Sequence, residues 1–67
     1  MKNTALKIAR IKKNFTQKEL AEKTNVTTKY ISVLECNNHL PSIAVMVKLS
    51  KILDEPMEVL FPQIKEL

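Results

Sequence analysis

Apolar residues recur at intervals of three and four positions along most of the chain, the spacing that places side chains on one face of an α-helix. Valine and isoleucine do not alternate strictly with polar residues in any segment, so no β-strand is predicted. A first helix is expected at residues 4–13, where the apolar residues spread over a wide arc: Ala5, Leu6, Ile8, Ala9 and Ile11. The pattern therefore predicts an all-α fold.

A capping motif marks the start of a second predicted helix, residues 17–24. Thr16-Gln17-Lys18-Glu19 has the Ser/Thr-x-x-Glu form, in which a hydroxyl and a carboxylate each accept a hydrogen bond from a free backbone N–H. Asn25 tolerates the left-handed conformation that closes a helix better than most residues other than glycine. The second helix is therefore expected to be short and to end at Thr24.

A third helix is predicted at residues 28–35, immediately after a second good N-cap, Thr27. Its apolar residues Ile31 and Leu34 are expected to face the core. The residues left on the outward face are mostly uncharged and polar: Thr28, Lys29, Ser32 and Val33. Two short helices joined by a tight turn match the helix-turn-helix arrangement.

Two further helices are expected in the second half of the chain. Ser42 caps a fourth, which ends near Leu53, before the break at Asp54-Glu55-Pro56. Its apolar side is formed by Ile43, Met46, Val47, Leu49 and Leu53. A short fifth helix covers residues 57–61 and stops before a proline. Residues 63–67 form either a fraying tail or one extra turn.

The length of 67 residues allows one domain, residues 1–67, and so small a domain buries only about 60% of the surface of its unfolded chain. A single cysteine, Cys36, cannot form an internal disulfide, and one cysteine with one histidine, His39, cannot complete a four-ligand zinc site. No metal and no cofactor are therefore expected. Stability has to come from packing, with dimerisation as a further source.

The net charge of +4 is unevenly distributed. Six of the eleven basic residues precede the first acidic residue, Glu19, whereas Asp54, Glu55, Glu58 and Glu66 lie near the other end. One end of the molecule is therefore expected to attract polyanions. No apolar run approaches the roughly 20 residues needed to cross a bilayer, and no signal peptide is recognisable. The expected location is the reducing cytoplasm, with no membrane partner.

Several motifs together resemble the phage repressor and Cro-like (XRE-type) helix-turn-helix family. They are the run from Phe15 to Thr27, Tyr30-Ile31-Ser32, Leu34-Glu35, Pro41-Ser42-Ile43 and Leu60-Phe61. The resemblance extends from about Leu6 to Phe61 without a gap. It implies a compact five-helix bundle of the lambda-repressor type, with the helix-turn-helix at about residues 17–36. Where the family commonly has glycine, this chain has Asn37 and Asp54, both residue types that tolerate left-handed geometry.

The resemblance also implies which residues meet DNA. Gln17, at the start of the second helix, is expected to contact a phosphate with its side chain or its backbone N–H. Bases and adjacent phosphates would be read by Thr27, Thr28, Lys29, Ser32 and Val33. Tyr30 is expected to pack against the second helix, with a phosphate contact by its hydroxyl left open. Asn37 and Asn38 would touch the sugar-phosphate backbone.

Two structural roles are also expected, one from the same resemblance and one from the apolar residues near the end of the chain. Arg10 and Glu35 are expected to form an ion pair that orients the third helix. A homodimer interface is expected at residues 57–67, where the apolar residues offer more surface than a small monomer can hide: Met57, Leu60, Phe61, Ile64 and Leu67.

The function expected from the sequence is that of a transcriptional regulator, a repressor or autoregulator. It would bind a pseudo-palindromic operator in double-stranded DNA as a homodimer, with the third helix in the major groove. Two alternatives are open: an antitoxin whose main partner is a toxin protein, and a protein-interaction module that does not bind DNA. Enzymatic activity is not expected, because the sequence offers no acid–base pair, nucleophile–base pair or metal cluster.

Overall fold

The computed structural model describes residues 3–36 and 39–66, without the side chains of the last two. The described residues form five α-helices and a 3-10 helix, and none of them is in a strand. The elements are α1 (Thr4–Lys12), α2 (Gln17–Thr24), α3 (Thr28–Cys36), α4 (Ile43–Leu53), α5 (Met57–Leu60) and the 3-10 helix η1 (Pro62–Glu66). The predicted all-α fold with five helices is confirmed. The segment after α5 forms an extra turn, not a fraying tail.

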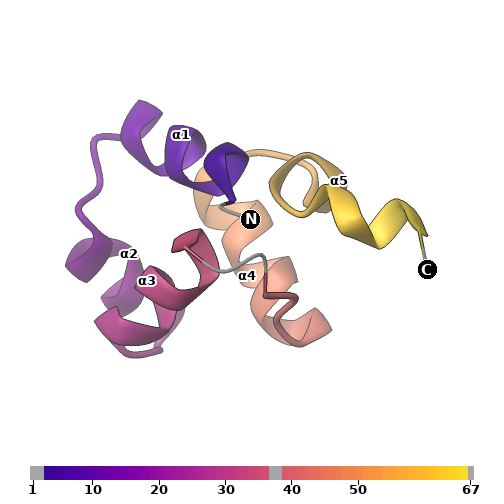
Figure 1. Ribbon diagram of the computed structural model, residues 1–67. Coiled ribbons are helices and arrows are strands. Elements are labelled where there is room, and N and C mark those ends of the chain that lie inside the picture. Colours follow the sequence, from indigo (N-terminus) through magenta and orange to yellow (C-terminus); the bar gives the residue numbers. More distant parts are fainter. Residues whose placement is uncertain (1–2, 37–38, 67) are drawn as a thin grey trace.

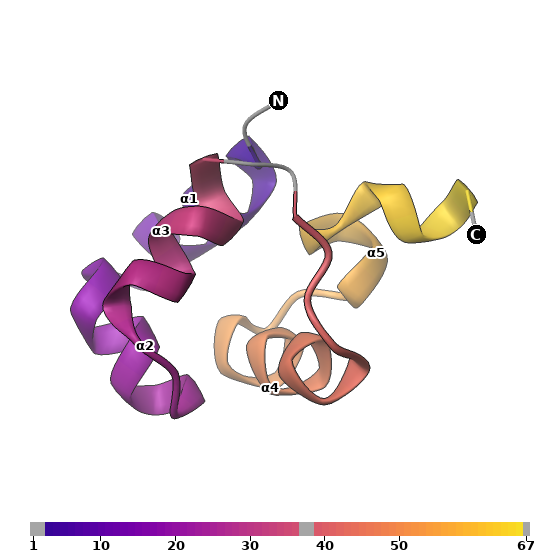
Figure 2. The same ribbon diagram turned by 60° about the horizontal axis from the view of Figure 1, so that its bottom comes forward.

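The helices pack into a body of 30 × 21 × 20 Å. In Figure 1, α1 runs across the top, α2 and α3 lie side by side below it, and α5 and η1 extend to the right. Figure 2 shows α4 between the α2–α3 pair and α5, and α4 contacts both α2 and α5. Of the two helices of the helix-turn-helix, α2 thus packs against α4 and α3 packs against α1.

Each helix boundary has a local cause in the sequence. Both hydrogen bonds of the capping box are present: each of the side chains of Thr16 and Glu19 accepts the backbone N–H of the other residue. Ser42 caps α4 through its side chain. Among the residues that the structure describes, three adopt the left-handed conformation: Asn14 (φ 60°), Asn25 (φ 61°) and Asp54 (φ 55°). The left-handed conformation expected at Asn25 and Asp54 is confirmed. Asparagine and aspartate take the place of the glycines that the chain lacks.

The core draws side chains from all five α-helices. Its buried members are Leu6, Ala9, Leu20, Ala21, Ile31, Leu34, Met46, Leu49, Leu53, Leu60 and Phe61. Phe61, just after α5, is the largest fully buried side chain. Since every helix contributes at least one of these residues, α3 is held in place by the whole domain.

The apolar sides predicted for the first and fourth helices were too wide. Ile8 and Ile11 are 49% and 52% exposed, and Ile43 is 71% exposed. Helix α1 packs through Leu6 and Ala9, and a domain of this size has no further helix to cover the opposite side. Ile43 is the first residue of α4 and lies beyond the packed part of that helix.

The expected dimer surface needs a correction at two positions. Leu60 and Phe61 are fully buried in the core of the single chain, so neither can contact a partner without opening the fold. The chain has only three aromatic residues, and the core uses Phe61 as its largest side chain. Met57 and Ile64 are partly buried against the same core. Leu67 lies outside the described residues.

Candidate nucleic-acid interface

The turn between α2 and α3 is short and well bonded. Asn25 reverses the chain in the left-handed conformation, and the Val26 N–H then donates to the carbonyl of Ala21 at 3.0 Å. The Val26 side chain packs against the core. The turn therefore fixes the angle between the two helices through a hydrogen bond and an apolar anchor.

Thr27 forms the N-terminal cap of α3. Its hydroxyl oxygen accepts a hydrogen bond from the Tyr30 N–H at 3.1 Å, which satisfies one of the free donors of the first helical turn. The residue itself is exposed. The start of α3 is thus an ordered and accessible helix terminus, with its positive dipole end toward solvent.

The outward face of α3 is polar at its beginning and becomes apolar further along. Thr28 and Lys29 are exposed, and Ser32 and Val33 are partly buried. On the opposite side Ile31 and Leu34 are fully buried. The helical spacing aligns Lys29, Val33 and the exposed Cys36, a residue not expected to be part of this face. Side chains for hydrogen bonding and for methyl contact are therefore presented together.

Tyr30 lies at one edge of this face. Its ring is partly buried and packs against the core. It also meets the His39 ring edge-on, with centroids 6.2 Å apart and planes at 80°. This contact joins α3 to the segment that leads to α4. It could not be read from the sequence, because the two residues share no helical register.

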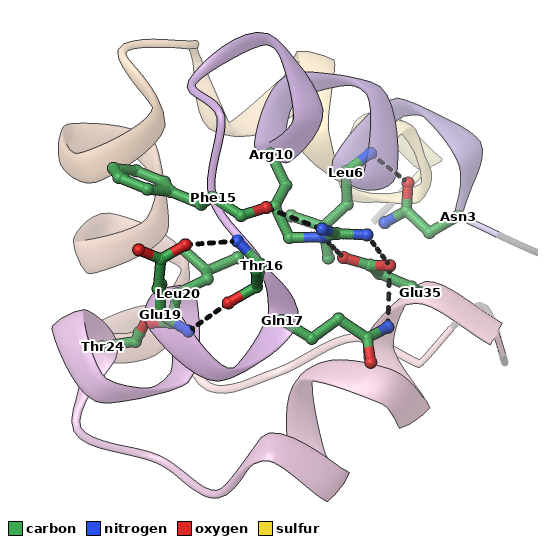
Figure 3. Close-up of polar contacts among 10 residues, drawn as sticks. All are labelled: Asn3, Leu6, Arg10, Phe15, Thr16, Gln17, Glu19, Leu20, Thr24 and Glu35. Carbon is green, nitrogen blue, oxygen red and sulfur yellow. Dashed lines mark hydrogen bonds and ion pairs between the residues drawn. The ribbon is translucent and has the colours of Figure 1, made fainter.

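A hydrogen-bonded network connects the first three helices, and Figure 3 shows its side chains converging. Arg10 of α1 donates through Nε to one carboxylate oxygen of Glu35 of α3 at 2.6 Å, and through a terminal nitrogen to the other at 3.3 Å. Arg10 also donates to the carbonyl of Phe15 at 2.8 Å. The two side chains are only 11% and 4% exposed. The pair thus ties the end of α3 to α1.

Gln17 completes the network from α2. Its amide nitrogen donates to the Glu35 carboxylate at 3.1 Å. Its side-chain carbonyl has no bond to the network. As the first residue of α2, Gln17 also has a backbone N–H without a helical acceptor. An acceptor such as a phosphate oxygen can therefore approach Gln17 while its side chain stays attached to Glu35.

A cavity of about 290 Å³ opens beside this network. Its lining comes from α1, the start of α2 and the end of α3: Asn3, Thr4, Lys7, Arg10, Gln17, Glu35 and Cys36. Lys7 is an exposed cation that the sequence-based assignment did not include. Because Lys7 lines the same cavity as Gln17, it adds positive charge near the start of the helix-turn-helix.

The capping box also has an electrostatic consequence. Glu19 accepts the Thr16 N–H at 2.8 Å, and its own backbone N–H donates to the Thr16 hydroxyl at 3.0 Å. The hydrogen bonds from Thr16 hold the pKa of the Glu19 carboxyl below its usual 4.5, with a smaller contribution from nearby Lys23. The charged form of Glu19 therefore stabilises the start of α2.

Two further findings limit the chemistry of the described residues. Within residues 3–36 and 39–66, no group of three or more His, Cys, Asp or Glu side chains is arranged to hold a metal ion. In the same part of the chain, no helix is long and apolar enough to cross a membrane.

Asn37 and Asn38, expected to contact the DNA backbone, lie outside the described residues.

Two short helices joined by a tight turn, the second capped and outward-facing, define a helix-turn-helix protein. The helix-turn-helix family model HTH_3 matches residues 6–60, which is most of the chain. The chain therefore belongs to this family of DNA-binding regulators of the Cro/C1 type. No individual curated protein matches the sequence.

Proposed function

We propose that this protein is a sequence-specific transcriptional regulator that reads DNA with α3 in the major groove. The observation that carries the proposal is the capped start of α3, with Thr28 and Lys29 exposed above the buried Ile31 and Leu34. A helix fits the major groove, whose width is about 12 Å, and presents the residues of its first turns to base edges.

Each residue of the interface has a role suited to its chemistry. Lys29 donates to guanine, and the methyl groups of Thr28 and Val33 pack against thymine methyls. Ser32 and Thr27 make hydrogen bonds to base edges or phosphates, and the Tyr30 hydroxyl contacts a phosphate. Gln17 binds a phosphate through its backbone N–H, which the Arg10–Glu35 network holds in position. The family resemblance adds Asn37 and Asn38 as backbone contacts.

The regulator acts as a homodimer on a pseudo-palindromic operator. Two copies of α3 then enter successive major grooves about 34 Å apart. The dimer contact uses the surface around α5, where Val59 is 45% exposed and Met57 and Ile64 are partly exposed. The sequence adds Leu67 to this proposed contact, outside the described residues. An operator that overlaps a promoter would make the protein a repressor, because the bound dimer occupies the site that polymerase needs.

Selection of bound sites from random duplexes tests this proposal. We expect enrichment of a symmetric sequence with two half-sites whose centres are about one helical turn apart. A pool that remains random at low ionic strength would contradict DNA recognition. Enrichment of a single half-site would contradict the dimer. A stable complex with a second protein that prevents enrichment would favour the antitoxin interpretation instead.

A further inference from the structure

Asn3, the residue just before α1, is 4% exposed. Its backbone carbonyl accepts the Lys7 N–H at 3.3 Å, as in a regular helix, and its other polar groups make three further hydrogen bonds. Its side-chain oxygen accepts the Leu6 N–H at 3.0 Å, a bond visible in Figure 3. Its side-chain nitrogen donates to the carbonyl of Leu60 at 2.8 Å. Its backbone N–H donates to the carbonyl of Glu35, also at 2.8 Å.

Each of these three further bonds satisfies a backbone group at the end of a different helix. The Leu6 N–H lies in the first turn of α1, the Glu35 carbonyl in the last turn of α3, and the Leu60 carbonyl at the end of α5. Such terminal groups have no partner within their own helix. Asn3 therefore joins three helix ends at one buried point.

Asparagine suits this position because its side chain carries both an acceptor and a donor. Serine or aspartate would serve equally well as the cap of α1. Aspartate has no N–H to donate to the Leu60 carbonyl, and the serine hydroxyl, although a donor, lies one bond closer to the backbone and falls short of it. This second bond is the one that attaches α5. Glu35 is attached twice, through its carbonyl to Asn3 and through its carboxylate to Arg10 and Gln17.

We propose that Asn3 is a positioning residue that sets the end of recognition helix α3 relative to α5. The proposal rests on the proposed function, in which α3 reads a half-site and the surface around α5 joins the two protomers. With α5 fixed, the separation of the two α3 helices is fixed as well. Asn3 thereby makes the dimer selective for one half-site spacing, although it touches neither DNA nor the partner.

The test compares Asn3→Ser with a matched control, Ser42→Ala. Asn3→Ser keeps a cap oxygen and the backbone bond to Glu35 but loses the bond to Leu60. Ser42→Ala removes the side-chain cap of α4, which is an exposed local bond. Affinity is measured by titration for the selected operator and for duplexes with one base pair inserted or deleted between the half-sites. Circular dichroism establishes that both variants are folded at the assay temperature.

We expect the preference of the unaltered protein for the correct spacing to fall about fivefold in Asn3→Ser, as loss of one hydrogen bond implies. Ser42→Ala should keep the original preference even if it melts at a lower temperature. Asn3→Ser with the original preference would overturn the proposal. If serine prevents folding, Asn3→Asp repeats the test, since it keeps the size and the cap oxygen without the N–H donor.

Amide hydrogen exchange on the free protein separates this proposal from the proposed function. The Phe61 and Ile64 amides, bonded within and just after α5, should exchange about fivefold faster in Asn3→Ser than in Ser42→Ala. Equal exchange in the two variants would overturn the attachment of α5 by Asn3, whether or not the protein binds DNA. If exchange is faster in Asn3→Ser but the protein selects no duplex, the attachment of α5 stands. The proposed regulator function and the selectivity for half-site spacing are then both refuted.

Discussion

Replacement of Arg10 by methionine tests the network that orients the recognition helix. Arg10→Met removes three hydrogen bonds, two to Glu35 and one to the Phe15 carbonyl, and leaves the buried Glu35 carboxylate with Gln17 as its remaining side-chain donor. Removing one partner of a buried pair costs about 3–5 kcal/mol. A chain of 67 residues is expected to have a total unfolding free energy of only about 3–10 kcal/mol. The variant should therefore be marginally folded at 25 °C.

The double variant Arg10→Met with Glu35→Leu separates the cost of an unpaired charge from the value of the pair itself. Because desolvation offsets much of the Coulomb attraction, apolar side chains of similar size should restore most of the lost stability. Urea unfolding followed by circular dichroism measures all three proteins. A loss below about 1 kcal/mol in Arg10→Met would mean that the pair behaves like an exposed one. A double variant no more stable than the single would refute the reasoning about desolvation.

Three shorter predictions address the interface, the capping box and the dimer. Lys29→Ala should lose about 1–3 kcal/mol of binding free energy on the selected operator and relax discrimination at one base pair. The control Lys48→Ala, which removes an exposed charge from α4, should leave base discrimination unchanged in the same titration. Glu19→Gln should be less stable than the original protein at neutral pH; because the folded-state pKa of Glu19 lies below 4.5, thermal melts should show this difference closing as pH falls below that value. Val59→Asp should give monomers in sedimentation, and Ile8→Asp, at a similarly exposed position on α1, should not; dimers in both variants would remove Val59 from the interface.

Apart from the Arg10–Glu35 ion pair, which only the family resemblance implied, the features predicted from the sequence are those that depend on near neighbours. The Thr16–Glu19 box spans three positions, and Asn25 and Asp54 close helices through their own backbone preferences. The periodic burial of Ile31 and Leu34 follows from helical geometry once the start of α3 is known. These local signals were enough to define the helices and the side of α3 that faces outward.

The features that could not be predicted depend on where separate helices meet. The two bonds of Asn3 to Glu35 and Leu60 connect residues more than thirty positions apart, and no local pattern marks them. Whether the apolar residues of α5 face the core or a partner depends on how α5 docks against α1 and α4, and the docking turned Leu60 and Phe61 inward. The hydrogen bond from Gln17 to Glu35 likewise appears only when α2 and α3 are placed together.

The left-handed asparagine at the turn between α2 and α3 has a consequence for how rigidly the protein presents α3. Unlike glycine, Asn25 has a Cβ atom that restricts the conformations of the unfolded chain, so folding forfeits less backbone entropy there. The same restriction limits hinge motion between the two helices in the folded state. The protein should therefore meet DNA as a preformed template, selecting duplexes whose groove already fits rather than adapting its own shape to them.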